Sequence, residues 1–178
     1  IQVVNEMSQK VNPSFEGKYY KIEGAYNNPK PAQAKIPLML GGSGTGLLKI
    51  ASKEADILNI IPPTGNGKDF INDKEATRRF TMAVLKERIK ILQDMLKNEG
   101  RPIADIEIGG LLLLGISKKS NDPELVDLAK QLGFNDLQTA QSSPVSLLGT
   151  PDEVGEEISK RFKETSMSYF IFVNGTKH

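Results

Sequence analysis

Apolar residues along the chain form two kinds of pattern, short continuous runs and longer stretches with apolar positions at helical spacing. The short runs predict four buried strands, at 36–40, 55–61, 106–116 and 169–173. The third run carries Gly109-Gly110, which indicates a bulge or a point of close backbone approach. Helical stretches separate the runs. This alternation is typical of βα units, in which helices cover a parallel sheet, and it predicts the α/β class.

The predicted helices cover residues 46–55 and 75–98, and two more begin at Asp122-Pro123 and at Thr150-Pro151. In the helix over 75–98 the apolar stripe consists of Leu85, Ile89, Leu92 and Leu96. The segment Thr150-Pro151-Asp152-Glu153 has the sequence of a capping box, with Pro at the first helical position. We expect the helix that follows it to bury Val154, Ile158 and Phe162.

The first 35 residues have a different pattern. Ile1, Val4, Met7 and Val11 recur at helical spacing, and Asn12-Pro13 ends this helix. No capping residue precedes it, so we expect the chain to be the C-terminal part of a longer protein. The aromatic-rich stretch 14–20 then predicts a small hairpin, which either packs on the domain or, less often for such hairpins, closes over a substrate.

The count of predicted elements suggests two architectures. Four strands and four major helices after the opening helix equal half of an eight-fold (β/α) barrel, and 178 residues fall short of the roughly 250 of a complete one. Four parallel strands also suffice for a small open sheet. The arithmetic alone leaves both architectures open.

Composition and charge narrow the classes of function. With 23 basic and 22 acidic residues the formal charge is +1, which disfavours nucleic acid and anionic membranes as partners. No apolar run reaches the roughly 18 residues of a membrane span, so a cytoplasmic location is the default expectation. Cys is absent and the only His is His178. Asp, Glu, Tyr, Lys and bound cofactors are therefore left to perform any chemistry, and we expect no metal site.

A glycine-rich turn is the most informative local motif. The first predicted strand runs directly into Gly41, Gly42, Ser43, Gly44 and Thr45, which open a helix. Glycines allow a ligand to approach the backbone, and the start of a helix favours an anion, so these five residues are a candidate phosphate site. The third Gly of the dinucleotide fingerprint is replaced by Leu at position 47, which argues against a Rossmann site. A plain strand-to-helix turn remains an equal alternative.

Three further features are candidates for contact with a ligand. Asn59 interrupts the second apolar run near its C-terminal end, where α/β enzymes place their sites. The polar loop 64–74 is long enough to suggest a role in the active site. Arg78-Arg79 is a weaker candidate for a phosphate clamp, because such pairs are more often solvated.

The order of several motifs along the chain resembles that of the bacterial luciferase-like flavin-dependent oxidoreductases, most closely the branch of deazaflavin-dependent enzymes. The motifs that carry this resemblance are Phe15-Glu16-Gly17-Lys18-Tyr19-Tyr20, Asn28-Pro29-Lys30-Pro31, Ile36-Pro37-Leu38, Gly41-Gly42-Ser43-Gly44, Ala55-Asp56-Ile57-Leu58-Asn59, Ser142-Ser143-Pro144 and Gly149-Thr150-Pro151-Asp152-Glu153-Val154. The resemblance implies a TIM barrel of which residues 1–178 form the C-terminal half, strands five to eight, within a single domain.

The resemblance also implies a function. The turn 41–45 would contact the phosphate of FMN or, alternatively, of the 8-hydroxy-5-deazaflavin coenzyme. The protein would then be an oxidoreductase or monooxygenase that acts on an unknown small organic substrate. In this family much of the ring pocket comes from the N-terminal half, so no catalytic residue is assigned and the chain alone is expected to be inactive.

Two other functions remain as alternatives. One is a non-catalytic half-barrel module that pairs with a second copy, and the other is a phosphosugar-processing TIM barrel. Four βα units leave two sheet edges without neighbours. We therefore expect either a homodimer or association with the missing N-terminal half.

Overall fold

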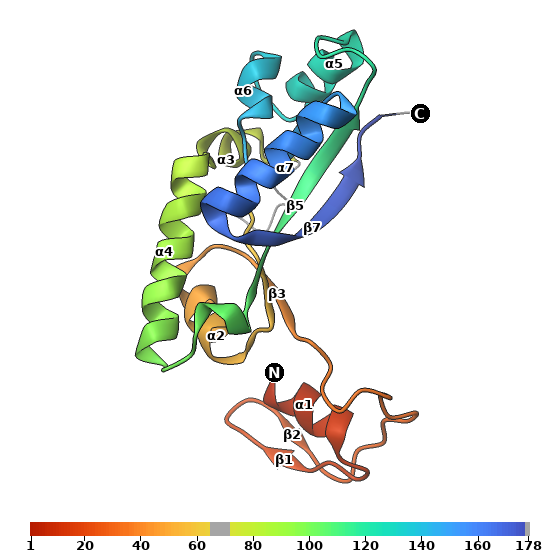
Figure 1. Ribbon diagram of the computed structural model, residues 1–178. Coiled ribbons are helices and arrows are strands. Elements are labelled where there is room, and N and C mark those ends of the chain that lie inside the picture. The colour runs from red at the N-terminus through yellow and green to blue at the C-terminus, as the bar shows by residue number, and fades with distance from the viewer. Residues whose placement is uncertain (65–71, 177–178) are drawn as a thin grey trace. The chain divides into compact units, whose positions relative to one another are not determined.

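The computed structural model describes residues 1–64 and 72–176, so most of the predicted polar loop 64–74 lies outside the described residues (Figure 1). The chain divides into two compact units, Ile1–Leu38 and the part from Met39 onward. The sequence predicts one domain that contains both units, and this assignment stays a prediction. No helix in the described ranges is long and apolar enough to cross a membrane.

The first unit contains one helix and one hairpin. The helix α1 covers Gln2–Gln9, and β1 (Phe15–Glu16) pairs antiparallel with β2 (Lys21–Ile22), which confirms the predicted hairpin. The side chains of Tyr19 and Tyr20 are largely exposed, at 77% and 72%, and the Tyr19 ring contacts the Lys18 ammonium group at 5.1 Å.

The second unit is built on a parallel sheet of five strands, which confirms the α/β prediction. The strands are β3 (Met39–Gly41), β4 (Ile57–Asn59), β5 (Glu107–Ile116), β6 (Ser146–Gly149) and β7 (Met167–Asn174). Neighbouring strands follow the order β3-β4-β5-β6, and β7 pairs with β5.

The ten-residue strand β5 organises this sheet. The backbone groups of Gly109 and Leu113 bond toward β4 and β6, whereas the carbonyl of Leu114 accepts a hydrogen bond from the N–H of Gly175, beyond the end of β7. Because backbone groups alternate in direction along a strand, β4 and β6 share one edge of β5 and β7 occupies the other. One continuous path, β3-β4-β5-β7, therefore crosses the sheet. β6 lies outside this path and pairs with the C-terminal part of β5, on the same edge as β4.

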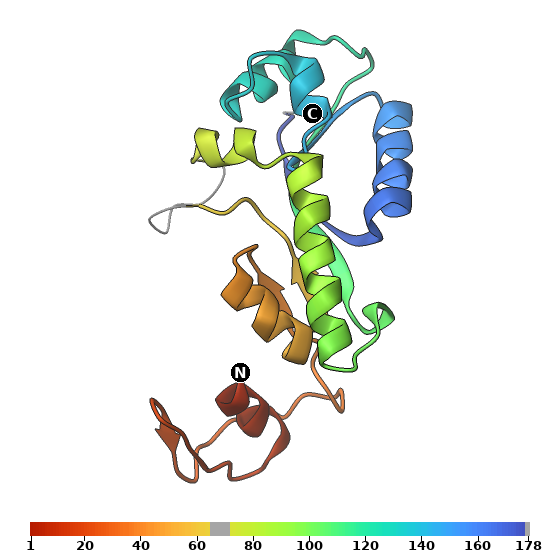
Figure 2. The same ribbon diagram turned by 90° about the vertical axis from the view of Figure 1, so that its left-hand side faces the viewer.

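Helices cover the sheet and connect its strands. They are α2 (Thr45–Glu54), α3 (Lys74–Arg79), α4 (Met82–Asn98), α5 (Pro123–Gln131), α6 (Leu137–Gln141) and α7 (Pro151–Thr165), with a short 3-10 turn at Ile103–Asp105. α2 lies against α4, and α7 lies against β6 and β7 (Figure 2).

The predicted apolar stripe of α4 is confirmed, because its four residues are buried in the main core. They share this core with Leu48 of α2, Leu58 of β4 and Ile108 of β5. The core thus lies on the face of the sheet that α2 and α4 cover.

The single helix predicted over 75–98 is wrong, because the chain leaves the helical conformation at Phe80 and Thr81. The Thr81 side chain accepts a hydrogen bond from the N–H of Val84 at 3.4 Å and caps α4. A Thr that caps a new helix interrupts the backbone while the apolar spacing continues across it. Periodicity therefore does not reveal the break.

Two predictions about strands are also wrong. The run 36–40 is not a buried strand, because Ile36 is 49% exposed and the strand begins only at Met39. Among the described strands, β3 pairs only with β4, and its residues are partly exposed or exposed. The prediction of four strands omits β6, whose four residues are all buried but too few to show a period.

The buried face of α7 differs from the predicted one. Val154 is buried and Ile158 is partly buried, but Phe162 is 57% exposed. Arg161 and Thr165 are buried on this helix instead. The predicted capping box is confirmed: Thr150 Oγ1 accepts from the N–H of Glu153, whose carboxylate accepts from the N–H of Thr150.

Candidate functional site

The glycine turn connects the end of β3 to the start of α2, as predicted. Gly42 has φ +145°, and its N–H donates to the carbonyl oxygen of Asn59 at 2.9 Å. A Cβ at this position would lie 2.5 Å from Cδ2 of Leu47. The turn therefore requires glycine at position 42 for its own geometry, before any ligand is considered.

The other glycines of this turn lie next to open space. A Cβ built on Gly41, Gly44 or Gly46 would meet no atom within 4 Å. Gly44 caps α2 without any side-chain hydrogen bond, whereas the five helices α3 to α7 each have a side-chain cap. The first turn of α2 thus presents backbone N–H groups that no side chain caps.

Two predicted site residues carry buried polar atoms with no partner. Ser43 is 4% exposed and Asn59 is 8% exposed, and neither Ser43 Oγ nor Asn59 Oδ1 has a hydrogen-bond partner. Most buried polar groups in proteins are paired, because an unpaired one costs about 1–3 kcal/mol. Ser43 is the second residue before α2 and Asn59 is the last residue of β4, so both unpaired atoms belong to the two segments that the Gly42–Asn59 hydrogen bond joins.

Strand register brings Asn59 to the turn. Gly41 pairs with Asn59, Asn59 with Gly109, and Gly109 with Tyr169, so these four residues form one row across four strands. The close backbone approach predicted at Gly109 is confirmed, because a Cβ there would lie 3.1 Å from the Tyr169 carbonyl oxygen. Sequence reasoning did not place Tyr169 in this row, because non-local register leaves no local signal.

Charged groups with clearly shifted pKa values lie away from this turn. The N–H of Thr150 lowers the pKa of Glu153, the hydroxyl of Ser117 lowers that of Asp122, and the N–H of Thr139 lowers that of Asp136, each by donating a hydrogen bond. All three carboxylates cap helices, so their shifts reflect structure. Among the described residues, no cluster of three or more His, Asp or Glu could hold a metal ion.

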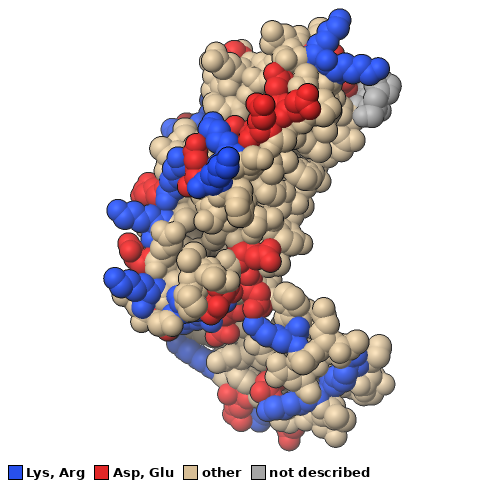
Figure 3. Space-filling view, in the orientation of Figure 1, with Lys and Arg blue, Asp and Glu red and all other residues tan. Residues whose placement is uncertain are grey.

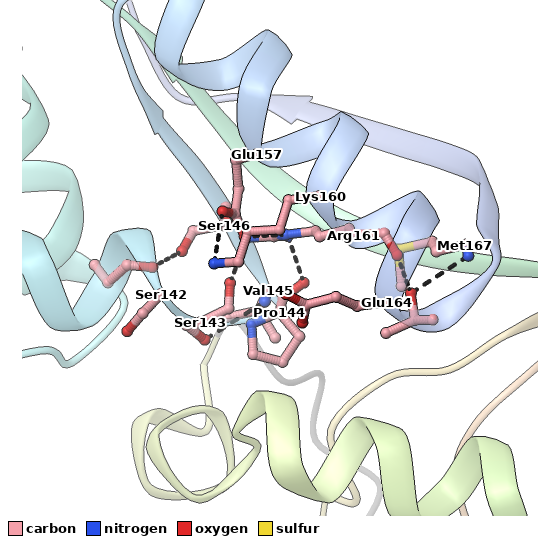
Figure 4. Close-up of polar contacts among 12 residues, drawn as sticks. Ser142, Ser143, Pro144, Val145, Ser146, Glu157, Lys160, Arg161, Glu164 and Met167 are labelled. Carbon is pink, nitrogen blue, oxygen red and sulfur yellow. Dashed lines mark hydrogen bonds and ion pairs between the residues drawn. The ribbon is translucent and has the colours of Figure 1, made fainter.

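The motif Ser142-Ser143-Pro144 has a structural role (Figure 4). The Arg161 guanidinium is fully buried and donates to the carbonyl oxygens of Ser143 at 2.9 Å, Pro144 at 3.3 Å and Ser146 at 2.8 Å. Its Nε donates to Glu157 Oε1 at 2.9 Å. Burial lowers the pKa of Arg161, and the Glu157 contact opposes that shift. Arg161 thereby ties α7 to the segment that leads into β6.

Arg79 pairs with Glu75 on the exposed surface of α3, which accords with the interpretation of Arg78-Arg79 as a solvated pair. The Arg79 guanidinium thus bonds within its own helix, and the alternative of an arginine phosphate clamp gains no support from this contact. The candidate site is therefore reduced to the turn 41–45 and Asn59.

No known protein-family model matches this chain. Solved structures do match it. An F420-dependent secondary alcohol dehydrogenase, solved with an F420-acetone adduct, aligns with a TM-score of 0.69 and 16% identity over 99% of this chain and 55% of its own. A coenzyme F420-dependent tetrahydromethanopterin reductase from Methanopyrus kandleri aligns with a TM-score of 0.69 and 15% identity, over 97% of this chain and 55% of its own.

A long-chain alkane monooxygenase also matches, with a TM-score of 0.60 and 14% identity, over 92% of this chain and 42% of its own. The chain therefore spans about half the length of these structures. At these identities the comparison establishes fold alone. The chain has the α/β fold of about half of a luciferase-like TIM barrel.

Proposed function

We propose that this chain is part of a flavin- or deazaflavin-dependent oxidoreductase or monooxygenase, and that its turn 41–45, together with Asn59, holds the cofactor. The unpartnered pair Ser43 Oγ and Asn59 Oδ1 carries this proposal. The fold supports it, because the structures with the same half-barrel include proteins described as F420-dependent and as a monooxygenase.

The chemistry of the turn fits a phosphate ester with a polyol chain. The Ser43 hydroxyl and the first N–H groups of α2 are donors, which suits phosphate oxygens. Asn59 Oδ1 is an acceptor and suits a hydroxyl group, such as one of a ribityl chain. FMN and the deazaflavin coenzyme share both groups. FMN is the first candidate and the deazaflavin coenzyme is the alternative.

The cofactor and the residues of the turn would have different roles in this site. When bound, the cofactor supplies the hydride or oxygen chemistry. The described residues anchor its polar tail: the open backbone at Gly41 and Gly44 allows close approach, and the Gly42 N–H, bonded to Asn59, holds the turn in place.

Titration of the protein that contains this chain with FMN, and separately with the deazaflavin coenzyme, tests the proposal. Saturable quenching of cofactor fluorescence by one of them is expected. Ser43→Ala and Asn59→Leu should each weaken binding at least tenfold, or about 1.4 kcal/mol.

Ser159→Ala is the matched control, because Ser159 lies on α7 and its hydroxyl bonds only within that helix, to the Gly155 carbonyl. It should leave the affinity unchanged. Failure of both cofactors to saturate the protein would refute the proposal. Unchanged affinity in Ser43→Ala and Asn59→Leu would move the phosphate site elsewhere.

A further inference from the structure

A β-bulge near the start of β7 sets the direction of Tyr169. The pairing of β7 with β5 shifts by one residue between Met167 and Tyr169, which makes Ser168 an extra residue. In a regular strand Tyr169 would point to the same face as Met167, which is buried in the core. The bulge instead pairs Tyr169 with Gly109. Bulges that re-aim a side chain in this way are frequent at barrel rims and beside active sites.

Tyr169 lies on the same face of the sheet as Asn59. Paired residues of parallel strands point to the same side, and Gly109 pairs with both Asn59 and Tyr169. Leu58 and Ile108, one position earlier on β4 and β5, are buried in the core that α2 and α4 cover. The row therefore points to the other face. It lies where β3 and β4 end, at the edge of the sheet where barrel enzymes bind their ligands.

Gly109 leaves room for the Tyr169 ring. A Cβ at position 109 would lie 3.4 Å from Cβ and 3.6 Å from Cδ1 of Tyr169. The tyrosine ring thus begins where a side chain at position 109 would project. Within the row, no side chain stands between Tyr169 and Asn59.

We propose that Tyr169 contacts the ring system of the cofactor, an inference that rests on the proposed function. The turn 41–45, which would hold the phosphate, begins at one end of the row, and Asn59, which would bind the polyol, comes next. The planar ring follows the polyol in the cofactor, as Gly109 and Tyr169 follow Asn59 in the row. Aromatic side chains pack favourably against other aromatic rings.

The composition of β7 fits a ring better than a second anionic group. Met167–Asn174 contains no charged residue. In Figure 3 charged side chains gather over α4 and α7, whereas the surface along β7 is uncharged. An apolar strand with one phenol suits a planar heteroaromatic ring.

Fluorescence of the bound cofactor tests this contact, because a phenol in contact with an excited flavin ring quenches its emission. The protein that contains this chain is saturated with FMN or, if FMN does not bind, with the deazaflavin coenzyme. Tyr169→Leu should weaken binding about tenfold, or about 1.4 kcal/mol, and raise the emission of the bound cofactor. Tyr169→Phe fills the same space without the phenol, so it should keep the affinity within about twofold and still raise the emission.

Phe172→Leu is the matched control. Phe172 is an aromatic residue of the same strand, three positions from Tyr169 and therefore on the opposite face. It should change neither the affinity nor the emission. Ser43→Ala should lower the affinity but leave the emission of the saturated protein at the wild-type level, because the hydroxyl of Ser43 would contact the phosphate and not the ring.

The outcomes separate this inference from the proposed function. Emission at the wild-type level in both Tyr169 variants would overturn the inference, while cofactor binding would still support the proposed function. An equal rise in Phe172→Leu would overturn it too, because the effect would then come from a disturbance of β7. If Tyr169→Leu does not fold, the emission of Tyr169→Phe decides. Failure of both cofactors to bind the wild-type protein would refute the proposed function itself, and the inference with it.

Discussion

The buried guanidinium of Arg161 donates a 2.8 Å hydrogen bond to the carbonyl oxygen of Ser146, the first residue of β6. A short strand of four residues is thereby joined to the helix that follows it. This contact explains why a long basic side chain occupies the inner face of α7.

Replacement of Arg161 by Met should strongly destabilise the chain. The substitution leaves the carbonyl oxygens of Ser143, Pro144 and Ser146 without their donor, and removal of one partner from a buried charged network costs about 3–5 kcal/mol. Urea unfolding measures the loss. Lys160→Met is the control, because the Lys160 side chain is 60% exposed and should matter little. A loss in Arg161→Met no larger than in the control would contradict this role.

Acid should destabilise the fold through its helix caps. The lowered pKa values of Glu153, Asp122 and Asp136 mean that the native state binds fewer protons than the unfolded one. Their contribution is fully present above the unfolded values, 4.5 for Glu153 and 3.8 for the two Asp residues, and is lost as the pH falls through the lower folded values. Unfolding free energies measured from neutral pH down to about pH 3 should show this decline.

Glu153→Gln isolates one of these carboxylates. Because Gln does not titrate, the decline below pH 4.5 should be shallower in this variant than in the wild type. Equal slopes in the two proteins would show that the Thr150 hydrogen bond contributes no pH dependence.

Two glycines of the turn should respond differently to alanine. Gly42→Ala places a Cβ in a backbone conformation that favours glycine and against Leu47, so it should lower the unfolding free energy by about 1–3 kcal/mol without any ligand. Gly41→Ala meets no atom and should leave stability nearly unchanged. Thermal unfolding of both variants checks this. Equal stability of the two would contradict the steric argument.

Glycines in α7 and β5 provide a second contrast. Gly155 lies inside α7, and a Cβ at this position would meet no atom within 4 Å, so Gly155→Ala should stabilise the chain by about 0.5–1 kcal/mol. A Cβ on Gly115 would lie 2.8 Å from side-chain atoms of both Leu128 and Leu148, and Gly115→Ala should cost about 1–3 kcal/mol. Denaturant midpoints that shift in the same direction for both would contradict the packing described here.

Local signals explain which parts of the fold could be predicted from the sequence. The capping box at Thr150 and Glu153 and the turn at Gly42 depend on neighbours within a few residues, and both predictions agree with the structure. Phe162 and Arg161 are adjacent on α7, and spacing alone does not decide which of them faces the core. The carbonyl groups that Arg161 satisfies lie 15 to 18 residues away.

The candidate site shows the same limit. Asn59 and the turn could be proposed from their positions at strand ends, because the carboxyl ends of parallel strands gather at one edge. The absence of partners for Ser43 Oγ and Asn59 Oδ1, and the alignment with Tyr169, depend on register and packing. No pattern in a single sequence encodes these properties.

The shared edge of β5 has a consequence for how the second unit opens. On one edge of β5, β4 pairs with Glu107–Gly109 and β6 with Leu113–Ile116, and on the other edge β7 pairs with Ile108–Leu114. β5 is therefore released only when these three strands separate from it. The amide of Leu112, fully buried in mid-strand, should therefore take up deuterium most slowly, at a rate set by global unfolding. Among the described strands β3 pairs only with β4, so in the chain as given its amides should exchange earlier through fraying.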